Sequence, residues 1–544
     1  MSRARRAITL IWFGALLSAC WSEAPTPEPD AAPKGRKGGR AEQPVDALAV
    51  PEGSRGNGNG PNILFIVWDT VRADHTSMYD YPKPTTPRTA LWAAESGVRY
   101  TRAVSPGVWT LPSHATLFTG LPVRTHGVDA DYTHLDDDYT TFAEAFYSAG
   151  YDTYAFSANP YIMDSTHLFQ GFATIEHPWE KPWKAKVGAF TRGKLIPEDA
   201  SGVLSPKWPK PAAKLNKYLF KEAGPIASEA LYAWIDRRED KTRPWFAFVN
   251  MMEAHIPRIP SLAARKKVMT DAQIARSYTL AETTEDFHRF MTGALKYTPE
   301  DLATIAAVYD AALVDLDDAT GVMLDELRTR GLDKDTIVIL VSDHGESLGD
   351  HDLLLHKYAV YDSLSHVPMV ISWVGHTPAS LEDLPVSTSE AIPRAIAMAN
   401  IPLAKDFLDA LAARPALQQR GAVTEYNAVA KGSLSKLEAE HEGVGLEHLE
   451  RTWRAIEIDQ WKLSLASDGT RELYDVIADP KEVRNIVKRD HITVDRIQAG
   501  LDAWFAAVPE VDKSKRTGTY TGHTSSEQKS ALEALGYLDN HKGN

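Results

Sequence analysis

The sequence predicts an α/β fold with a mainly parallel central sheet, helices on both faces and a smaller antiparallel subdomain near the C-terminus. Three runs, residues 62–68, 244–250 and 335–341, are apolar and mostly β-branched or aromatic, as in strands buried on both faces of a sheet. Residues 301–330 follow the pattern of a long amphipathic helix. Short strand patterns with a turn signal occupy residues 453–474, as in an antiparallel sheet.

The composition is that of a globular protein. The chain has 544 residues, of which 43% are hydrophobic and 24% charged, enough for one large core or two domains. The formal net charge of −14 is spread along the chain, so nothing indicates a nucleic-acid partner. Cys20 is the single cysteine, which excludes an intrachain disulfide and a cysteine-based metal site.

The N-terminus follows the pattern of an export signal. Basic residues 1–6 precede an apolar run, residues 7–17, that is too short to span a membrane comfortably. The sequence Leu17-Ser-Ala-Cys20 then resembles the bacterial lipobox, which implies cleavage before Cys20 and acylation of its sulfur. We therefore expect residues 1–19 to be a lipoprotein signal peptide. An ordinary signal peptide with a chance cysteine is the alternative.

The mature chain is accordingly expected to be an exported bacterial lipoprotein, held at a membrane by its lipid anchor. Trp21 follows the cysteine where an inner-membrane lipoprotein has aspartate, which favours the outer membrane, on the periplasmic or cell-surface side. Residues 20–60 are rich in proline and glycine and predict a tether. The folded body is expected to begin near residue 61.

A candidate site begins where the first buried strand ends. Asp69 follows residues 62–68, and a carboxylate at the C-terminal end of a buried strand lies where open α/β sheets place their ligands. A helix over residues 86–95 and a strand over residues 98–104 then lead to a loop at Thr110. The helix after this loop would direct its N-terminal amides toward Thr110, an arrangement suited to a phosphate or sulfate group.

Residues 175–235 form a long segment after a predicted helix, residues 141–149, and a predicted strand, residues 151–156. The segment contains Trp179, Trp183 and Trp208 among prolines and lysines. Two interpretations stay open. These side chains form an aromatic and basic wall of a substrate pocket, or the aromatic rings fix a long loop to the body.

Two further strand ends carry imidazoles. His255 follows the strand at residues 244–250, and Asp343 and His344 follow the strand at residues 335–341. A carboxylate beside an imidazole suits Zn²⁺, Mn²⁺ or Fe²⁺ better than Ca²⁺, which prefers oxygen ligands alone.

The remaining elements complete the predicted architecture. A strand is expected over residues 367–373, and a helix over residues 494–507 is expected to pack on the antiparallel strands. We predict a catalytic domain at residues 61–420 and a C-terminal subdomain with a tail at residues 421–544.

Val108-Trp-Thr-Leu-Pro-Ser-His-Ala-Thr-Leu-Phe-Thr-Gly120 resembles the active-site signature of the sulfatases, a branch of the alkaline phosphatase superfamily. Their pattern is Cys or Ser, any residue, Pro, Ser, Arg, and then a helical run that ends in Thr-Gly. This register puts Thr110 at the position of the nucleophile and His114 at that of the arginine. The resemblance extends over roughly residues 60–540 and implies a sulfatase-like three-layer sandwich.

The resemblance also implies roles for individual residues. Asp69, Asp343, His344 and the nucleophile Thr110 would together hold one divalent metal. Mn²⁺ or Zn²⁺ is favoured, and Ca²⁺ is a further option. His255 would contact the anionic head of the substrate, and Lys357 and His356 would contact the oxygens of the transferred group. His114 would orient the loop or assist proton transfer.

The chain departs from the family pattern at two further places. Thr70 stands where most members have a second aspartate ligand, so one expected carboxylate is missing. Residues 157–160, Ser-Ala-Asn-Pro, stand where many arylsulfatases have Gly-Lys-Trp-His. The second departure weakens any transfer of arylsulfatase specificity to this chain.

Threonine at position 110 changes the chemistry that the family signature implies. Sulfatases oxidise their Cys or Ser to formylglycine, which requires a Cβ bearing two hydrogens, and the methyl group on the Cβ of Thr110 closes that route. A threonine alkoxide beside a divalent metal can still attack phosphorus. Superfamily relatives with a threonine nucleophile, such as lipoteichoic acid synthases, act on phosphoesters and resemble this chain in having one metal site with an Asp-His pair.

The sequence therefore predicts a metal-dependent hydrolase of anionic esters that favours cleavage or transfer of phosphomonoesters or phosphodiesters. The expected substrate is a small-molecule, glycan or lipid ester. A sulfuric ester hydrolase of the arylsulfatase kind is one alternative. A sulfatase-fold binding protein without catalysis is another. The leaving group, the acceptor and the oligomeric state stay open.

Overall fold

The computed structural model describes residues 55–195, 220–280, 282–413, 421–427 and 445–515, together with residues 429, 434, 529, 531 and 532. These residues belong to one compact unit, residues 47–544. The predicted signal peptide, Cys20 and the tether up to residue 54 lie outside the described residues. Within the described part, no helix is both long enough and apolar enough to cross a membrane.

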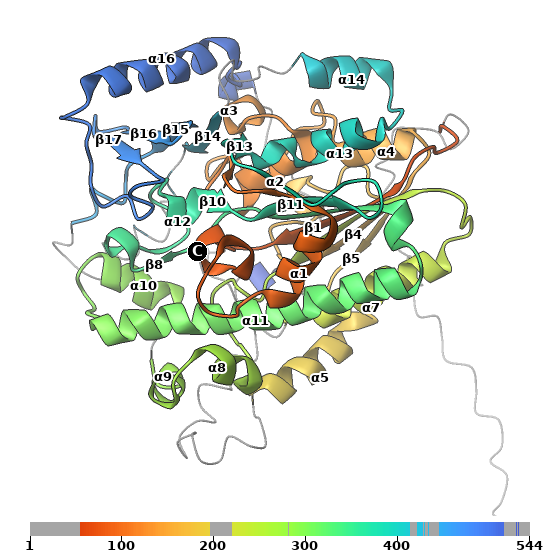
Figure 1. The fold of residues 1–544 in the computed structure, drawn as a ribbon, viewed down its shortest axis with the longest axis horizontal. Helices are drawn as coiled ribbons and strands as arrows, with labels where there is room; N and C mark the ends of the chain where they lie inside the picture. The colour runs from red at the N-terminus through yellow and green to blue at the C-terminus, as the bar shows by residue number, and fades with distance from the viewer. Residues whose placement is uncertain are drawn as a thin grey trace, which may run out of the picture. The chain divides into compact units, whose positions relative to one another are not determined.

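The central sheet has eight strands in the order β12-β2-β11-β7-β1-β6-β4-β5 (Figure 1). The strands from β7 to β5 in this order run parallel, whereas β11 is antiparallel to both β7 and β2. The sheet is mixed and mainly parallel, as predicted. Its strands are β1 (Asn62–Trp68), β2 (Gly97–Tyr100), β4 (Asp152–Ser157), β5 (Thr174–Glu176), β6 (Trp245–Met251), β7 (Thr336–Ser342), β11 (Met369–Trp373) and β12 (Ser380–Glu382).

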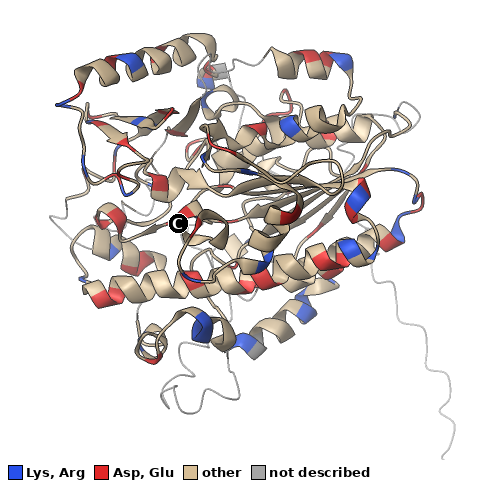
Figure 2. Ribbon diagram, in the orientation of Figure 1, with Lys and Arg blue, Asp and Glu red and all other residues tan. Residues whose placement is uncertain are grey.

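The centre of the sheet forms the core of the molecule. Every residue of β6 and β7 is buried, and so is every residue of β1 except its half-buried first residue, Asn62. Side chains that are apolar on both faces of a strand need a covering layer on each side. Charged residues accordingly lie mainly on the outer helices and loops, and the central strands are almost free of them (Figure 2).

Helices cover both faces of the sheet, as predicted (Figure 1). One layer consists of α1 (Pro87–Ser96), α7 (Gly224–Arg237) and α11 (Pro299–Thr329), and the other of α2 (Thr110–Thr119), α4 (Phe142–Ser148) and α13 (Ala391–Ala399). The long helix α11 begins at a capping box in which Thr298 and Asp301 cap each other's backbone amides. Outside α11 lie α8 (Leu262–Val268) and α9 (Asp271–Ser277), which pack on it through their own apolar cluster.

The C-terminal subdomain is an antiparallel sheet in the order β14-β15-β16-β17. Its strands are β14 (Gly421–Tyr426), β15 (Trp453–Ile458), β16 (Trp461–Ala466) and β17 (Arg471–Asp475), and α16 (His491–Ala507) packs against it. Ile456 and Leu463 of the sheet and Ile497 and Leu501 of the helix share one buried apolar cluster. The predicted strands, turn and packing helix of this region are confirmed.

The remaining short elements connect these layers. They are β3 (Ala103–Val104), α3 (Val123–His126), α5 (Trp183–Leu195), α10 (Thr284–Met291), β8 (Ser347–Leu348), β9 (Leu354–Leu355), α12 (Asp362–Ser365), β10 (His366–Val367), β13 (Val386–Ser387) and α14 (Lys405–Ala412).

Two predicted strands are each divided in the structure. Residues 98–104 form β2 and then β3, and β3 belongs to a separate three-stranded sheet with β10 and β13. At the break, Arg102 turns inward and forms buried ion pairs with Asp362 (2.8 Å) and Glu457 (2.6 Å). Residues 367–373 are likewise divided at Pro368, because proline has no N–H to contribute to a ladder.

The segment at residues 175–235 differs from the expected loop. Its described part contains the end of β5, the helix α5 and most of α7, and residues 196–219, with Trp208, lie outside the described residues. Trp179 stacks on His177 with 4.4 Å between ring centroids, and Phe220 meets Trp179 edge-on. Trp179 and Trp183 are both buried.

Candidate active site

The C-terminal ends of β1, β7, β6 and β4 meet at one edge of the sheet and carry polar side chains there. Asp69 follows β1, Asp343 and His344 follow β7, and Thr110 is the first residue of α2. All four are at most 1% exposed. The sheet thus brings together residues that are up to 275 positions apart, as its parallel topology requires.

Three of these residues form a candidate metal centre. Asp69, Asp343 and His344 each offer one ligand atom, and these three atoms all lie within 4.8 Å of one another. The Oδ1 atom of Asp69, Oδ2 of Asp343 and Nε2 of His344 are buried and have no hydrogen-bond partner. Buried polar atoms without partners are costly, so a divalent cation bound by all three would satisfy them together.

The surrounding hydrogen bonds keep these three atoms available. His344 Nδ1 lies 3.0 Å from the carbonyl oxygen of Gly345, which fixes the ring tautomer that leaves Nε2 with its lone pair. Asp343 accepts the backbone N–H groups of Thr70 (3.1 Å) and His344 (2.8 Å) through Oδ1, and its Oδ2 lies 3.2 Å from His344 Nε2. The residues therefore fit a bound metal in both ligand type and orientation.

The electrostatics of this cluster also fit a cation. Burial and the neighbouring Asp343 carboxylate raise the pKa of Asp69 to about 7. Burial opposes charge on His344 as well, but the same carboxylate prevails and raises its pKa to about 9, so at neutral pH Nε2 carries a proton that a bound cation would replace. The cluster thus holds two fully buried carboxylates, where a second negative charge is destabilised unless a positive charge is present.

Thr70, which stands where most family members have a second aspartate, contacts the site through its backbone. Its backbone has a φ of +62°, a left-handed conformation that is uncommon for a β-branched residue. This conformation lets its N–H reach Asp343, while its carbonyl accepts the hydroxyl of Tyr309 (2.8 Å). The backbone at position 70 thus helps to fix the Asp343 side chain.

Thr110 is connected to the metal centre by an asparagine. Asn159 Nδ2 donates to Asp69 Oδ2 (2.7 Å) and lies 3.3 Å from Thr110 Oγ1, which can accept from the same amide group. Asn250 Nδ2 donates to Asp69 Oδ2 as well (3.3 Å). Neither asparagine was predicted as a site residue. Asn250 lies at the C-terminal end of β6 and Asn159 just beyond that of β4, and a polar side chain at such a position can indicate a site.

His114 is the residue at the arginine position of the family signature. Its Nδ1 lies 2.9 Å from the carbonyl oxygen of Thr110 and 3.5 Å from Asp343 Oδ2. The ring is fully buried against Phe118 and Phe248, and this burial lowers its pKa. A neutral imidazole bonded to the backbone of Thr110, at the start of α2, favours the orienting role over proton transfer.

His255 and His356 lie beside the metal centre. The two rings are 4.9 Å apart, and His356 stacks on His344 at 4.6 Å. Burial lowers the pKa of both well below 6.5, so both rings are neutral. His356 Nδ1 lies 3.1 Å from Glu346 Oε1, and the other oxygen of Glu346 accepts from Arg258 (2.7 Å).

Two lysines lie near these groups. Lys357 places its Nζ 5.1 Å above the ring of Trp109, the residue before Thr110, and burial lowers its pKa to about 8. Lys221 is fully buried, and its Nζ has no hydrogen-bond partner and lies 3.7 Å from Glu222. Its charge contributes to the lowered pKa of His255. No sequence pattern pointed to Lys221, because it lies in the segment before α7.

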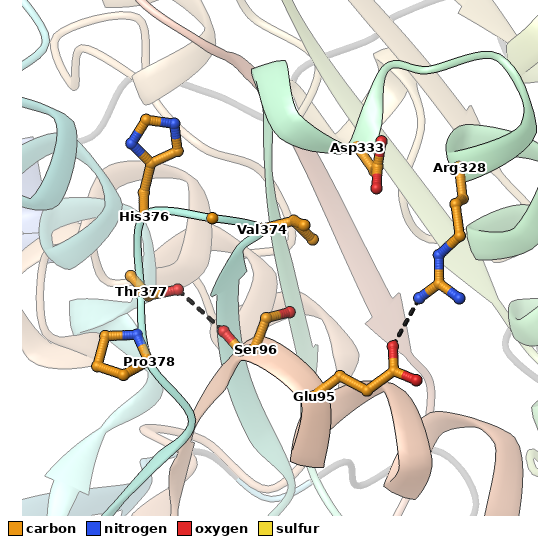
Figure 3. A pocket seen from close by; sticks show the side chains of 9 residues that line it. Glu95, Ser96, Arg328, Asp333, Val374, His376, Thr377 and Pro378 are labelled. Atoms are coloured by element: carbon orange, nitrogen blue, oxygen red, sulfur yellow. Dashed lines mark hydrogen bonds and ion pairs between the residues drawn. The ribbon is translucent and has the colours of Figure 1, made fainter.

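A surface pocket of about 590 Å³ lies elsewhere, beside Asp333 and the turn at residues 374–378 (Figure 3). Asp333 comes just before β7 whereas Asp343 comes just after it, so the pocket lies at the opposite end of that strand. Arg328 and Glu95 in its wall form an ion pair of 2.7 Å. The pocket contains no cluster of metal-ligating side chains, and we assign it no role in catalysis.

Comparison with known proteins finds sulfatases among the similar sequences and a phosphonate monoester hydrolase among the similar structures. The ulvan-active sulfatase of Formosa agariphila is 24% identical over 457 residues, which cover 81% of this chain and 80% of that protein. The choline-sulfatase of Rhizobium meliloti is 26% identical over 483 residues, which cover 82% and 85%. The crystal structure of the phosphonate monoester hydrolase of Agrobacterium radiobacter has a TM-score of 0.58 at 21% identity and covers 84% of this chain and 97% of its own.

That structural similarity confirms the predicted three-layer fold. The family model named Sulfatase matches residues 61–401, more than half of the chain and all four residues at the sheet edge. The chain is therefore a hydrolase that belongs to the sulfatase family.

Proposed function

We propose that this protein is a metal-dependent hydrolase of anionic esters in which Thr110 is the nucleophile, with phosphomonoesters or phosphodiesters favoured over sulfate esters. The observation that carries the proposal is the link from Thr110 Oγ1 through Asn159 to Asp69, within the candidate metal centre. A hydroxyl at a helix N-terminus beside unpartnered ligand atoms is placed for nucleophilic attack.

The residues that would hold the metal are Asp69, Asp343 and His344. Two carboxylate oxygens and one imidazole nitrogen favour Mn²⁺ or Zn²⁺, with Ca²⁺ as the weaker fit. When bound, such a cation would lower the pKa of the Thr110 hydroxyl and neutralise charge on the transferred group.

The chain's own residues supply the remaining parts of the reaction. Thr110 Oγ loses its proton and forms a bond to phosphorus as the bond to the leaving alcohol breaks, and that proton passes to the departing oxygen. Water then attacks the phosphothreonine and restores the hydroxyl. Lys357, charged at neutral pH, would stabilise the oxygens of the transferred group, and the neutral His255 and His356 can each accept or share a proton there.

Sulfate esters are the second candidate substrate. The names of the relatives from Formosa agariphila and Rhizobium meliloti support it. The methyl group of Thr110 opposes it, because threonine cannot form the aldehyde that sulfatases use. A glycan, lipid or small-molecule ester fits either chemistry, and we further propose that the protein is exported and held at a membrane through Cys20.

A comparison of three chromogenic esters separates these candidates. The full chain, with Mn²⁺, Zn²⁺ or Ca²⁺ supplied in turn, is assayed with p-nitrophenyl sulfate, p-nitrophenyl phosphate and bis-p-nitrophenyl phosphate. We expect cleavage of a phosphoester with Mn²⁺ or Zn²⁺ and little release of sulfate. Dominant sulfate release would contradict the threonine argument, and metal binding without turnover of any ester would support a non-catalytic protein.

Replacing Asn159 with alanine is expected to lower kcat by about 10- to 100-fold, the range found when a residue that orients a metal ligand is lost. The variant removes the amide that donates to Asp69 and lies beside Thr110 Oγ1. Asn62→Ala is the matched control, because Asn62 lies at the other end of β1 and bonds Thr336. An Asn159→Ala enzyme as active as the control would remove Asn159 from the site.

The pH dependence of kcat/KM is expected to follow the protonation of Lys357. Burial lowers the pKa of this lysine to about 8, and the charged form is the one that stabilises oxygens. Raising the pH through 8 removes the charge, so kcat/KM should fall on the alkaline side. Arginine stays protonated beyond this range, so Lys357→Arg should shift the fall to higher pH, even if the maximal rate drops. The same alkaline fall in both enzymes would show that another group titrates.

A further inference from the structure

A surface of the C-terminal subdomain combines exposed apolar and basic side chains. It is formed by residues 477–492, the connection from β17 to α16 together with the start of α16, and is here named the 477–492 surface. Ile477 is 63% exposed, Val483 72% and Ile492 86%, which places them among the most exposed large hydrophobic side chains of the described residues. All three belong to one short stretch of chain, which also carries the basic side chains described next.

The basic and the acidic side chains of this surface differ in their exposure and in their bonding partners. Its basic side chains are exposed: Lys481, Arg484, Lys488 and Arg489. Its acidic side chains are engaged within the fold. Glu482 is buried, pairs with Lys462 (3.1 Å) and accepts the amide of Asp362 (2.5 Å). Asp479 is also buried and accepts the amide of Arg484, and Asp490 caps α16 through Thr493. The outward face is therefore positive in a chain whose net charge is −14.

We propose that the 477–492 surface docks on an anionic lipid bilayer. Basic side chains are attracted to acidic headgroups, and protruding isoleucine and valine side chains enter the interfacial region of a bilayer. A polyanionic glycan would use the basic side chains and leave Ile477, Val483 and Ile492 in water. A second copy of the chain would bring like charges together across a symmetric interface. The bilayer is the partner that uses both kinds of side chain.

The 477–492 surface is joined to the loop that carries His356 and Lys357. Glu482 bonds the first residue of α12, Asp362, which follows this loop directly. Tyr361, the residue before it, stacks on His351 at 3.6 Å and donates to Glu472 of β17. The proposal itself does not depend on which ester is cleaved.

Vesicle co-sedimentation tests the proposal. The full chain carries Cys20→Ser, so that no lipid anchor contributes, and is mixed with phosphatidylcholine vesicles with or without phosphatidylglycerol. We expect binding that requires phosphatidylglycerol. The double variant Lys488→Gln with Arg489→Gln should weaken vesicle binding about 25-fold, because each lost charge weakens binding about fivefold. The double variant Val483→Ser with Ile492→Ser should weaken vesicle binding roughly tenfold, because less apolar area then enters the bilayer.

The matched control is Leu91→Ser with Lys405→Gln, because Leu91 is 64% exposed on α1 and Lys405 is exposed on α14, away from the 477–492 surface. This control should bind as the parent does, and all variants should keep the parent thermal melt. Three results would overturn the proposal. They are unchanged binding by both surface variants, binding to heparin but to no vesicle, and a dimer in sedimentation velocity that Ile492→Ser dissociates.

Discussion

Replacing Thr110 with alanine is expected to lower kcat by at least about 10⁴-fold, because the variant has no nucleophilic oxygen. Stability should hardly change. The hydroxyl lies at the long distance of 3.3 Å from Asn159 Nδ2, and the amide of Asn159 retains its shorter bond to Asp69. A change of about 1 kcal/mol or less would shift the Tm of a chain of this size by no more than about 3 °C.

Thr110→Ser is the matched control, since it keeps the hydroxyl and removes the methyl group. Its kcat should stay within about tenfold of the parent. Metal binding is measured by calorimetry on all three proteins and should be present in each, because the three proposed ligand residues are unchanged. Turnover that survives in Thr110→Ala at the parent rate would contradict the role of Thr110. Loss of metal binding in that variant would mean that it damages the site more widely.

Asp343→Asn is expected to abolish both metal binding and turnover while leaving the apoprotein folded. The asparagine oxygen can still accept the N–H groups of Thr70 and His344, so the loop keeps its hydrogen bonds. Its amide nitrogen, however, replaces Oδ2, which is the atom without a partner, and an amide N–H₂ is not a metal ligand. In the parent protein a metal at 100 times its Kd should stabilise the native state by about 2.7 kcal/mol.

The measurement for this prediction is the thermal melt with EDTA and then with excess Mn²⁺ or Zn²⁺. The parent should gain stability with the metal, and Asp343→Asn should melt at the same temperature in both conditions. Asp335→Asn serves as the control, because Asp335 is exposed just before β7, at the other end of the strand that Asp343 follows. A metal-dependent shift of equal size in Asp343→Asn would refute the proposed metal site.

The candidate metal centre could be predicted from the sequence because each of its residues follows a recognisable strand. An apolar run that ends in Asp69, or in Asp343 and His344, specifies both the strand and the edge of the sheet at which its last side chains lie. Parallel order then brings these ends together. The sequence predicts Thr110 in a loop just before a helix, whereas α2 begins at Thr110 itself and contains Pro112 in its first turn.

The contacts that support these residues could not be predicted, because each joins positions far apart in the sequence. Asn159 bonds Asp69 across 90 positions, and Arg102 pairs with Glu457 across 355. The position of Asn159 just beyond β4 is a local signal for a site residue, but its partner Asp69 is not visible from the local sequence. The division of residues 98–104 into two strands has the same origin, because a buried arginine breaks the strand only where its distant partners lie.

The most direct test of Thr110 as nucleophile is to trap its covalent intermediate. The enzyme with metal is mixed with a phosphoester that it cleaves, the reaction is stopped in acid during steady turnover, and the peptide containing Thr110 is analysed by mass spectrometry. We expect a phosphoryl group, or its monoester when the substrate is a diester, on Thr110, and none in Thr110→Ala. A turning-over enzyme whose Thr110 stays unmodified while another residue carries the group would contradict the central claim.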